Sequence, residues 1–291
     1  MNSNPPFSRL ALIGVGYIGG SAALAARRAG LVASVVGYDV AAQAGPLAVA
    51  RGVVDEMAES AEAAAAGASM VLLAAPVQSL AGLVRRIAGR LAPTATVIDV
   101  GSVKQPVVLD ADLALPSGQF VGCHPMAGAE HTDVGAADPE IFAGRMCFVC
   151  PTDRTSVDAA RAATRFWQGV GCQVESIEAW LHDRLMAAVS HLPHVAAFAL
   201  AASLADSLPL VESNALLDRP TTSLRDTTRI AASSPQVWRD ILLANREHLL
   251  PLVRELEQRV RSIGAAMAAG DAPALEAALA LGQACRARLV K

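Results

Sequence analysis

The chain has 291 residues, which is enough for two domains, and 53% of them are hydrophobic while only 4% are aromatic. Its formal net charge of −3 is small and is not gathered in blocks, so we expect no nucleic-acid partner. The five cysteines are odd in number, which argues against a disulfide framework and favours a reducing, cytoplasmic environment.

Short runs of β-branched residues alternate with alanine-rich stretches through the first half of the chain. This alternation is typical of an α/β domain, and it predicts a Rossmann-type, doubly wound and mostly parallel sheet within residues 1–178. The expected strands are residues 10–13, 34–38, 70–74, 96–100, 120–123, 146–150 and 173–176.

A glycine-rich motif follows the first expected strand. Gly14, Gly16 and Gly19 form a GxGxxG pattern, and a helical stretch at residues 21–28 comes directly after it. In this setting the glycines allow a tight turn and a close approach of the backbone to a pyrophosphate, which then faces the helix N-terminus. The motif therefore predicts a dinucleotide site.

The preferred dinucleotide depends on the end of the second expected strand. Asp39 lies about 20 residues after Gly19, where a carboxylate accepts hydrogen bonds from ribose hydroxyls and repels a 2′-phosphate. The other interpretation of Asp39 is an ordinary loop or cap residue. We expect NAD rather than NADP, bound by Gly14, Gly16, Tyr17, Ile18, Gly19, Asp39, Ala75 and Pro76.

Cys147 and Cys150 form a single CxxC pair within an expected strand. Residues three apart in a strand point to opposite faces, and no second pair of ligands follows. We therefore expect two buried thiols here and no metal site.

After residue 178 the strand signals stop, and we expect residues 179–291 to form an all-α dimerisation domain. Its first helix covers residues 179–204 and should bend at Pro193. A loop at residues 212–223 leads to helices that include residues 251–267 and 273–288. Because this domain is so apolar, we expect it to bury surface in a homodimer.

Residues 185–204 are apolar enough to raise the question of a membrane segment. The stretch contains Ser190, His191, Pro193 and His194. These residues favour a buried helix of a protein with no membrane partner.

His124 stands at the end of an expected strand, between Gly122 and Gly128 and against Pro125. Open α/β sheets bind ligands just outside the carboxyl ends of their strands. A titratable imidazole at this place is positioned to handle a proton near neutral pH.

Five motifs in this order resemble the prephenate dehydrogenase family, which includes the arogenate and cyclohexadienyl dehydrogenases of tyrosine biosynthesis. They are the glycine loop, DVGSVK at residues 99–104, GCHPMAGAE at 122–130, SHLPH at 190–194 and RDTTRIA at 225–231. The resemblance implies an oxidative decarboxylation. Hydride leaves the ring carbon that bears the 4-hydroxyl for the nicotinamide, carbon dioxide departs, and the ring becomes aromatic.

The resemblance also implies roles for individual residues. A neutral His124 would accept or polarise the proton of the 4-hydroxyl, and Ser102 would hydrogen-bond the same hydroxyl. Arg229 would bind a substrate carboxylate, for which a guanidinium fork is suited. The remaining substrate contacts implied are His194, Arg225, Glu130, Trp238 and Ser190.

Several of these assignments have structural alternatives. Arg225 and Arg229 are four residues apart on one expected helix face, where either could instead form a surface ion pair with Asp226 or Asp240. Trp238 would reach the partner subunit's pocket or pack in the core, and His191 is equally suited to a structural role. His182 and Asp183 could form a gate, but the pattern favours ordinary helix-start residues.

Substrate preference stays open, because residues 219–224 lack the glycines that the family often shows before RDxTRIA. The alternatives are prephenate and arogenate, and Glu130 is our candidate for the residue that decides between them. A β-hydroxyacid dehydrogenase is disfavoured, because that class needs a lysine early in the helical half and there is none between Lys104 and Lys291. A remote alternative is a non-catalytic, NAD-sensing dimer.

Overall fold

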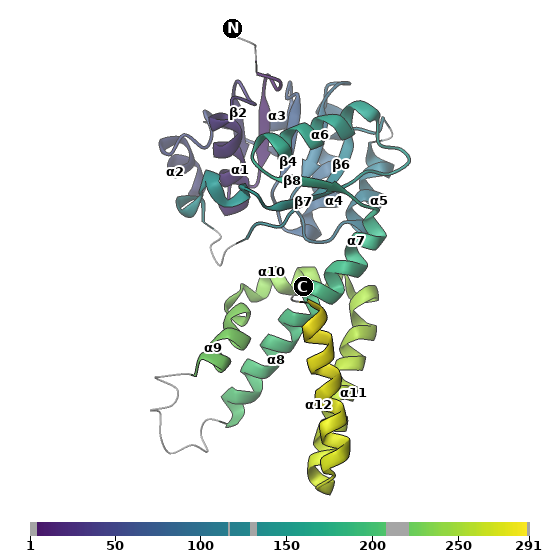
Figure 1. Ribbon diagram of the computed structural model, residues 1–291. Helices are drawn as coiled ribbons and strands as arrows, with labels where there is room; N and C mark the ends of the chain where they lie inside the picture. The colour runs from purple at the N-terminus through teal and green to yellow at the C-terminus, as the bar shows by residue number, and fades with distance from the viewer. Residues whose placement is uncertain (1–4, 116, 129–132, 208–220, 290–291) are drawn as a thin grey trace.

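The computed structural model describes residues 5–115, 117–128, 133–207 and 221–289, without side chains for residues 205–207. Figure 1 shows a sheet with helices packed on it, from which a set of longer helices extends. The last strand ends at Ser176 and the next helix begins at Ala179. The domain boundary at residues 178/179 stays a prediction.

The described residues form an eight-stranded sheet in the order β3-β2-β1-β4-β5-β6-β7-β8. Strands β1 to β6 are parallel, β7 is antiparallel to β6, and β8 is parallel to β7. The strands are β1 (Leu10–Ile13), β2 (Val35–Tyr38), β3 (Glu56–Met57), β4 (Met70–Leu73), β5 (Thr96–Asp99), β6 (Phe120–Pro125), β7 (Met146–Cys150) and β8 (Gln173–Ser176).

The predicted Rossmann-type sheet is confirmed, with two differences. The prediction missed β3, a two-residue edge strand that is too short to give a pattern. It also ended β6 at Cys123, whereas the strand continues to Pro125, so His124 lies within the ladder opposite Phe148. Pairing with β7 explains the longer strand.

Helices cover both faces of the sheet. Along β1 the buried side chains alternate, because Leu10 and Leu12 join one apolar cluster while Ala11 and Ile13 join the other. The first cluster contains residues of α1, α2 and α6, and the second contains residues of α3, α4 and α5. These helices are α1 (Tyr17–Arg28), α2 (Ala44–Ala50), α3 (Ala61–Ala65), α4 (Val77–Ile87), α5 (Gln105–Ala114) and α6 (Val157–Gly169).

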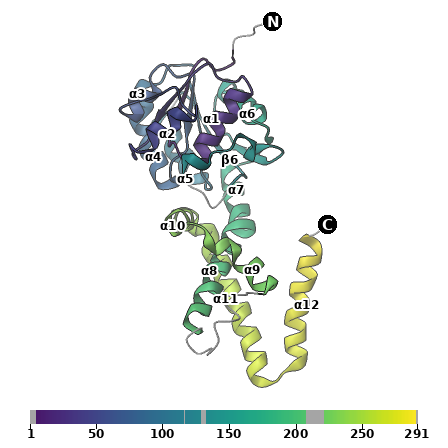
Figure 2. The same ribbon diagram turned by 90° about the vertical axis from the view of Figure 1, so that its left-hand side faces the viewer.

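The described residues after Ser176 are helices and their connections. They comprise α7 (Ala179–Met186), the π-helical turn η4 (Ala187–His191), α8 (Leu192–Ser207), α9 (Thr222–Thr228), the 3-10 turn η7 (Arg229–Ala232), α10 (Pro235–Ala244), α11 (Arg246–Ala269) and α12 (Ala272–Leu289). Figure 2 shows α11 and α12 as an antiparallel pair that projects away from the sheet.

Two predicted boundaries in this part are wrong. Helix α11 begins at Arg246 rather than Pro251, so Pro251 lies inside the helix, where it lacks the N–H that would bond to the carbonyl four residues earlier. Helix α9 begins at Thr222, inside the predicted loop, since the Thr221 hydroxyl accepts a hydrogen bond from the Leu224 N–H. Most of that predicted loop, residues 212–220, lies outside the described residues.

The long helix before that loop carries a π-helical turn next to Pro193. Proline lacks a backbone N–H and clashes with the carbonyl four residues earlier, and the wider turn η4 accommodates both effects. Ala179–Leu204 is long and apolar enough to span a membrane by length and composition, and 22% of its apolar window is buried. The prediction of a buried helix is therefore wrong for the single chain.

Candidate active site

The glycine loop lies between the carboxyl ends of β1 and β4, which are neighbours although β2 and β3 separate them in sequence. This is the switch point at which open α/β sheets bind ligands. Gly14 has a φ of 98°, and a Cβ there would collide with the Ala74 carbonyl. A Cβ on Gly19 would collide with the Gly14 carbonyl. Only glycine allows this close approach of loop, strand and helix.

The N-terminus of α1 is open to an anion. Gly16 caps it without a side-chain hydrogen bond, and the first turn contains no acidic residue. The helix dipole and the backbone N–H groups of the first turn therefore favour a phosphate at this end of α1. Ala75 and Pro76 follow β4 and complete the neighbouring loop up to the start of α4.

Asp39 organises this loop from the end of β2. Its carboxylate accepts hydrogen bonds from the Val15 N–H at 2.7 Å and the Ala41 N–H at 2.8 Å. Arg51, the first basic residue after Asp39, donates to the carbonyls of Val134, Gly135 and Ala137. Arg51 is thus engaged away from any 2′-phosphate.

His124 lies in β6 and contacts a second histidine, from α7. The His124 Nδ1 atom is 2.8 Å from His182 Nε2, and His182 Nδ1 is 2.8 Å from Asp183 Oδ1. His182 and Asp183 are almost completely buried, and the Phe148 ring packs edge-on against His182. The prediction that these two are ordinary helix-start residues is wrong, since they extend the environment of His124.

The surroundings of the His124 imidazole favour its neutral form. Burial is the main cause that holds its pKa well below the usual value, and the neighbouring His182, Lys104 and His191 act in the same direction. Its Nε2 atom makes no hydrogen bond to another described residue. A neutral ring with a free Nε2 can accept a hydrogen bond from a ligand.

Asp183 is fixed by the start of α5 and by the helical domain. Its two carboxylate oxygens accept the backbone N–H groups of Lys104 at 2.7 Å and Gln105 at 2.8 Å. Asn245 donates to the Asp183 backbone carbonyl at 2.8 Å and lies 3.0 Å from His191 Nδ1. The start of α5 therefore holds the Asp183 carboxylate, and Asn245 holds the Asp183 backbone.

A buried ion pair joins the loop that carries Ser102 to β6. Lys104 pairs with Asp99, and both side chains are fully buried. Lys104 Nζ also donates to the Cys123 carbonyl at 2.9 Å, while Asp99 accepts the Cys123 N–H at 2.8 Å. Ser102 itself makes no hydrogen bond to another described residue, so its hydroxyl is available to a ligand.

A second group of site candidates lies in the helical domain. The His194 ring stacks on Trp238, with centroids 3.5 Å apart and an interplanar angle of 20°. His194 Nδ1 donates to the Ser190 carbonyl at 2.9 Å, which leaves Nε2 for a ligand. Burial and the charge of Arg229 lower the pKa of His194, while the bond to Ser190 raises it. Within a single chain, then, Trp238 packs on His194.

The arginine candidates do not share one regular helix, because Arg225 lies in α9 and Arg229 begins η7. Both are exposed, and neither forms an ion pair with a described residue. Asp240 instead pairs with Arg239. Glu130 lies outside the described residues.

The CxxC cysteines are buried free thiols in β7, as predicted. Burial raises the pKa of Cys150 to about 12, and it also raises the pKa of Cys147. Groups of three or more His, Cys, Asp or Glu residues placed to hold a metal are absent from the described part of the chain.

Comparisons with known proteins match both halves of the chain. Residues 22–176 match the family model described as "Prephenate dehydrogenase, nucleotide-binding domain", and residues 178–281 match "Prephenate dehydrogenase, dimerization domain". The chain belongs to the prephenate dehydrogenase family. The predicted resemblance is confirmed, and the β-hydroxyacid dehydrogenase alternative is excluded as the family.

Individual relatives agree with this assignment. A prephenate dehydrogenase of Bacillus subtilis is 34% identical over 82% of this chain, and the match spans 64% of that enzyme's length. A cyclohexadienyl dehydrogenase of Zymomonas mobilis is 30% identical, and the match covers 91% of this chain and 90% of that enzyme. A crystal structure of the Aquifex aeolicus prephenate dehydrogenase with hydroxyphenyl propionate and NAD+ is 31% identical, with a TM-score of 0.84 and coverage of 97% and 98% of the two chains.

Proposed function

We propose that this member of the family converts prephenate to 4-hydroxyphenylpyruvate and carbon dioxide, with hydride transfer to NAD+. The observation that carries the proposal is the buried His124 imidazole, whose Nε2 has no described partner, in β6 next to β5 and the Ser102 loop that follows β5. Prephenate is a dianion, and the loss of a hydride and of carbon dioxide leaves a monoanion. The summed reaction therefore releases no proton.

The residues around the glycine loop fit NAD. The open N-terminus of α1, with Gly14, Gly16 and Gly19, would hold the pyrophosphate, and Asp39 would accept the ribose hydroxyls. Bound NAD+ supplies the hydride acceptor. NADP is disfavoured, because the Asp39 carboxylate would repel a 2′-phosphate.

His124 acts on the substrate hydroxyl. As the hydride leaves the ring carbon, positive charge builds up on the attached oxygen, and His124 Nε2 stabilises it by accepting the hydroxyl hydrogen bond. The hydroxyl proton remains on the oxygen, or moves to His124 Nε2 and returns to the oxygen as the ring becomes aromatic. Ser102 contacts the same hydroxyl from the loop after β5.

The carboxylates of the substrate bind in the helical domain. Arg229 forms charge-assisted hydrogen bonds to one of them, and His194 adds a contact from a ring that is held by Ser190 and Trp238. Arg225 contributes positive charge nearby. Glu130 follows the His124 motif and is our candidate for the side-chain end of the substrate.

Arogenate is the second candidate substrate. The support for it is the cyclohexadienyl dehydrogenase relative, which matches nine-tenths of both chains. The chemistry at His124 is the same for both substrates, because they differ only in a keto or an amino group on the side chain.

The protein forms a homodimer through its C-terminal helices in this proposal. Helix α12 has no buried residue and α11 has only Leu249, yet both carry large exposed apolar side chains. These include Val260, Met267, Leu279, Leu281 and Leu289. Light scattering should give twice the 30.0 kDa chain mass, and Val260→Glu with Leu281→Glu should give monomers.

Initial rates of nicotinamide reduction test the proposed function. Prephenate and arogenate are each assayed with NAD+ and NADP+, and the products are identified. We expect turnover of prephenate with NAD+, in keeping with a cytoplasmic biosynthetic enzyme. Turnover of neither substrate, with NAD+ still bound, would support the NAD-sensing alternative.

A further inference from the structure

The Nδ1 side of His124 is occupied by a chain of buried groups whose protons can be assigned. The chain runs from His124 to His182 and then to Asp183, through two contacts of 2.8 Å. Each imidazole can donate or accept at either nitrogen, depending on its tautomer. Which nitrogen donates in each of these hydrogen bonds therefore decides whether His124 Nε2 is a donor or an acceptor.

The carboxylate end fixes which nitrogens donate. Asp183 accepts the backbone N–H groups of Lys104 and Gln105, so it is an acceptor on both oxygens. His182 Nδ1 then donates to it. When each of the two rings carries one proton, the Nε2 lone pair of His182 faces His124 Nδ1, which carries the proton of that contact.

We propose that His182 and Asp183 are positioning residues that hold His124 as the Nδ1–H tautomer, so that its Nε2 lone pair receives the substrate hydroxyl. The inference rests on the proposed function for the identity of that hydroxyl. With the other tautomer, His124 would present an N–H donor to the oxygen on which positive charge develops. The hydrogen bond would then oppose hydride departure.

The surroundings make the arrangement stable. The side chain of His182 is fully buried, so water does not compete for its nitrogens, and the Phe148 ring lies 5.6 Å from it at 74°. Asp183 is placed where α5 begins, which favours a negative charge. Together these contacts hold the carboxylate and the two rings in one orientation.

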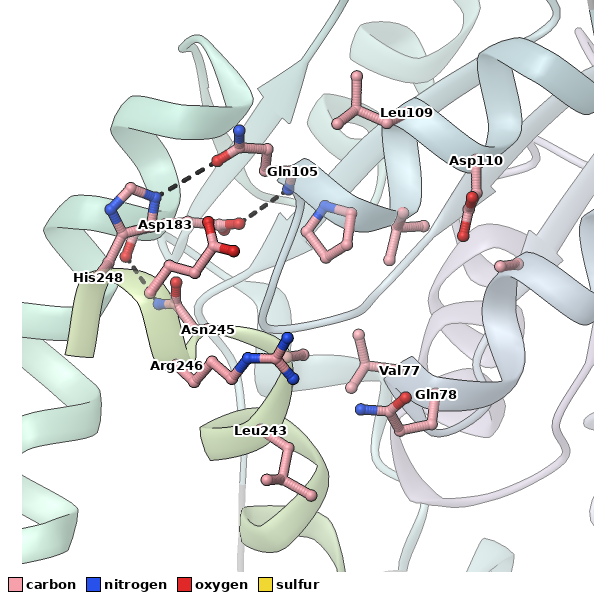
Figure 3. A pocket seen from close by; sticks show the side chains of 15 residues that line it. Val77, Gln78, Gln105, Leu109, Asp110, Asp183, Leu243, Asn245, Arg246 and His248 are labelled. Atoms are coloured by element: carbon pink, nitrogen blue, oxygen red, sulfur yellow. Dashed lines mark hydrogen bonds between the residues drawn. The ribbon is translucent and has the colours of Figure 1, made fainter. Parts of the chain in front are cut away.

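Asp183 also lines a cavity of about 410 Å³. Another histidine in the wall of this cavity provides a matched control. Figure 3 shows His248 in its wall, with a dashed line from the ring to Gln105 Oε1, a contact of 3.3 Å. His248 lines the same cavity as Asp183 but makes no contact with His124 or His182. The same substitution at His248 and at His182 therefore distinguishes loss of the hydrogen-bonded series His124–His182–Asp183 from a general disturbance of this region.

Nitrogen-15 NMR of the histidine-labelled enzyme, without substrate, tests the proposal. We expect His124 and His182 each to show a protonated Nδ1 and an unprotonated Nε2, with signals assigned by their loss in His124→Asn and His182→Phe. A protonated Nε2 on wild-type His124 would overturn the proposal. This measurement does not depend on turnover. The tautomer assignment can therefore fail while the proposed function holds, and the proposed function can fail while the tautomer assignment holds.

The second measurement compares His182→Phe with His248→Phe. Phenylalanine keeps a ring beside Phe148 but offers His124 no acceptor, so we expect a lower Nδ1–H fraction on His124. We also expect kcat to fall about 10- to 100-fold, as for other residues that orient a functional histidine, with the KM for prephenate unchanged. His248→Phe should keep the tautomer and kcat. An unchanged kcat in folded His182→Phe would contradict the assignment.

Discussion

Lys104 and Asp99 form a fully buried ion pair, and both side chains also hold the backbone of Cys123, the residue before His124. The pair thus connects the loop of Ser102 to the strand of His124. Ser102 follows β5 and His124 lies in the neighbouring β6, so this connection helps to set the distance between the two groups proposed to contact one hydroxyl.

Removing one partner of this pair should destabilise the protein strongly. Lys104→Met leaves the Asp99 charge buried and unpaired, and we expect the free energy of unfolding to fall by about 3–5 kcal/mol. Denaturant unfolding at fixed protein concentration measures the loss. The double variant Lys104→Met with Asp99→Asn should recover part of it. Equal midpoints for Lys104→Met and wild type would contradict the role of the pair.

The pH dependence of kcat/KM follows from the pKa of His124. His124 must be neutral to accept a hydrogen bond, and burial holds its pKa well below 6.5. As the pH falls, the active neutral form is therefore lost only well below 6.5. We expect constant kcat/KM for prephenate down to pH 6.5 and a decline only in more acidic buffer. A half-maximal value at or above pH 6.5 would be inconsistent with the buried, neutral ring.

Arg229 should contribute to substrate binding rather than to stability. Replacing it by methionine removes charge-assisted hydrogen bonds to a carboxylate, and we expect kcat/KM for prephenate to fall about 10- to 100-fold. Arg239→Met is the control, since that exposed arginine pairs with Asp240. Similar values of kcat/KM for the two variants would rule out a carboxylate contact at Arg229.

Asp39 should determine the preference for NAD+ over NADP+. Asp39→Asn keeps the shape but removes the charge, one ribose acceptor and one backbone hydrogen bond. We expect kcat/KM for NAD+ to fall about tenfold, while the disadvantage of NADP+ shrinks. Steady-state kinetics with both cofactors measure the ratio. A ratio identical to that of wild type would show that Asp39 is only a loop residue.

Local patterns in the sequence were sufficient for the sheet and for the glycine loop. The strands before Gly14 and around His124 are short apolar runs, and they lie in the mostly parallel sheet that the pattern predicts. Residue types also identified the buried cysteines of β7. These features depend on neighbours along the chain, which a sequence displays directly.

The partners of His124 could not be found in this way. His182 is 58 residues from His124, and a histidine and an aspartate at a helix start look like ordinary first-turn residues. One signal was present, since His182 shares a helix face with Met186, four residues on, and both are buried. The Asp99–Lys104 pair was also missed, because burial of an ion pair is set by tertiary packing.

The turnover number of His124→Asn tests the central claim most directly. We expect kcat with prephenate and NAD+ to fall about 10²- to 10⁴-fold, because the variant lacks the acceptor for the hydroxyl proton. The Kd for NAD+, measured by calorimetry, should stay at the wild-type value, since His124 lies outside the glycine loop. An unchanged kcat would contradict the account.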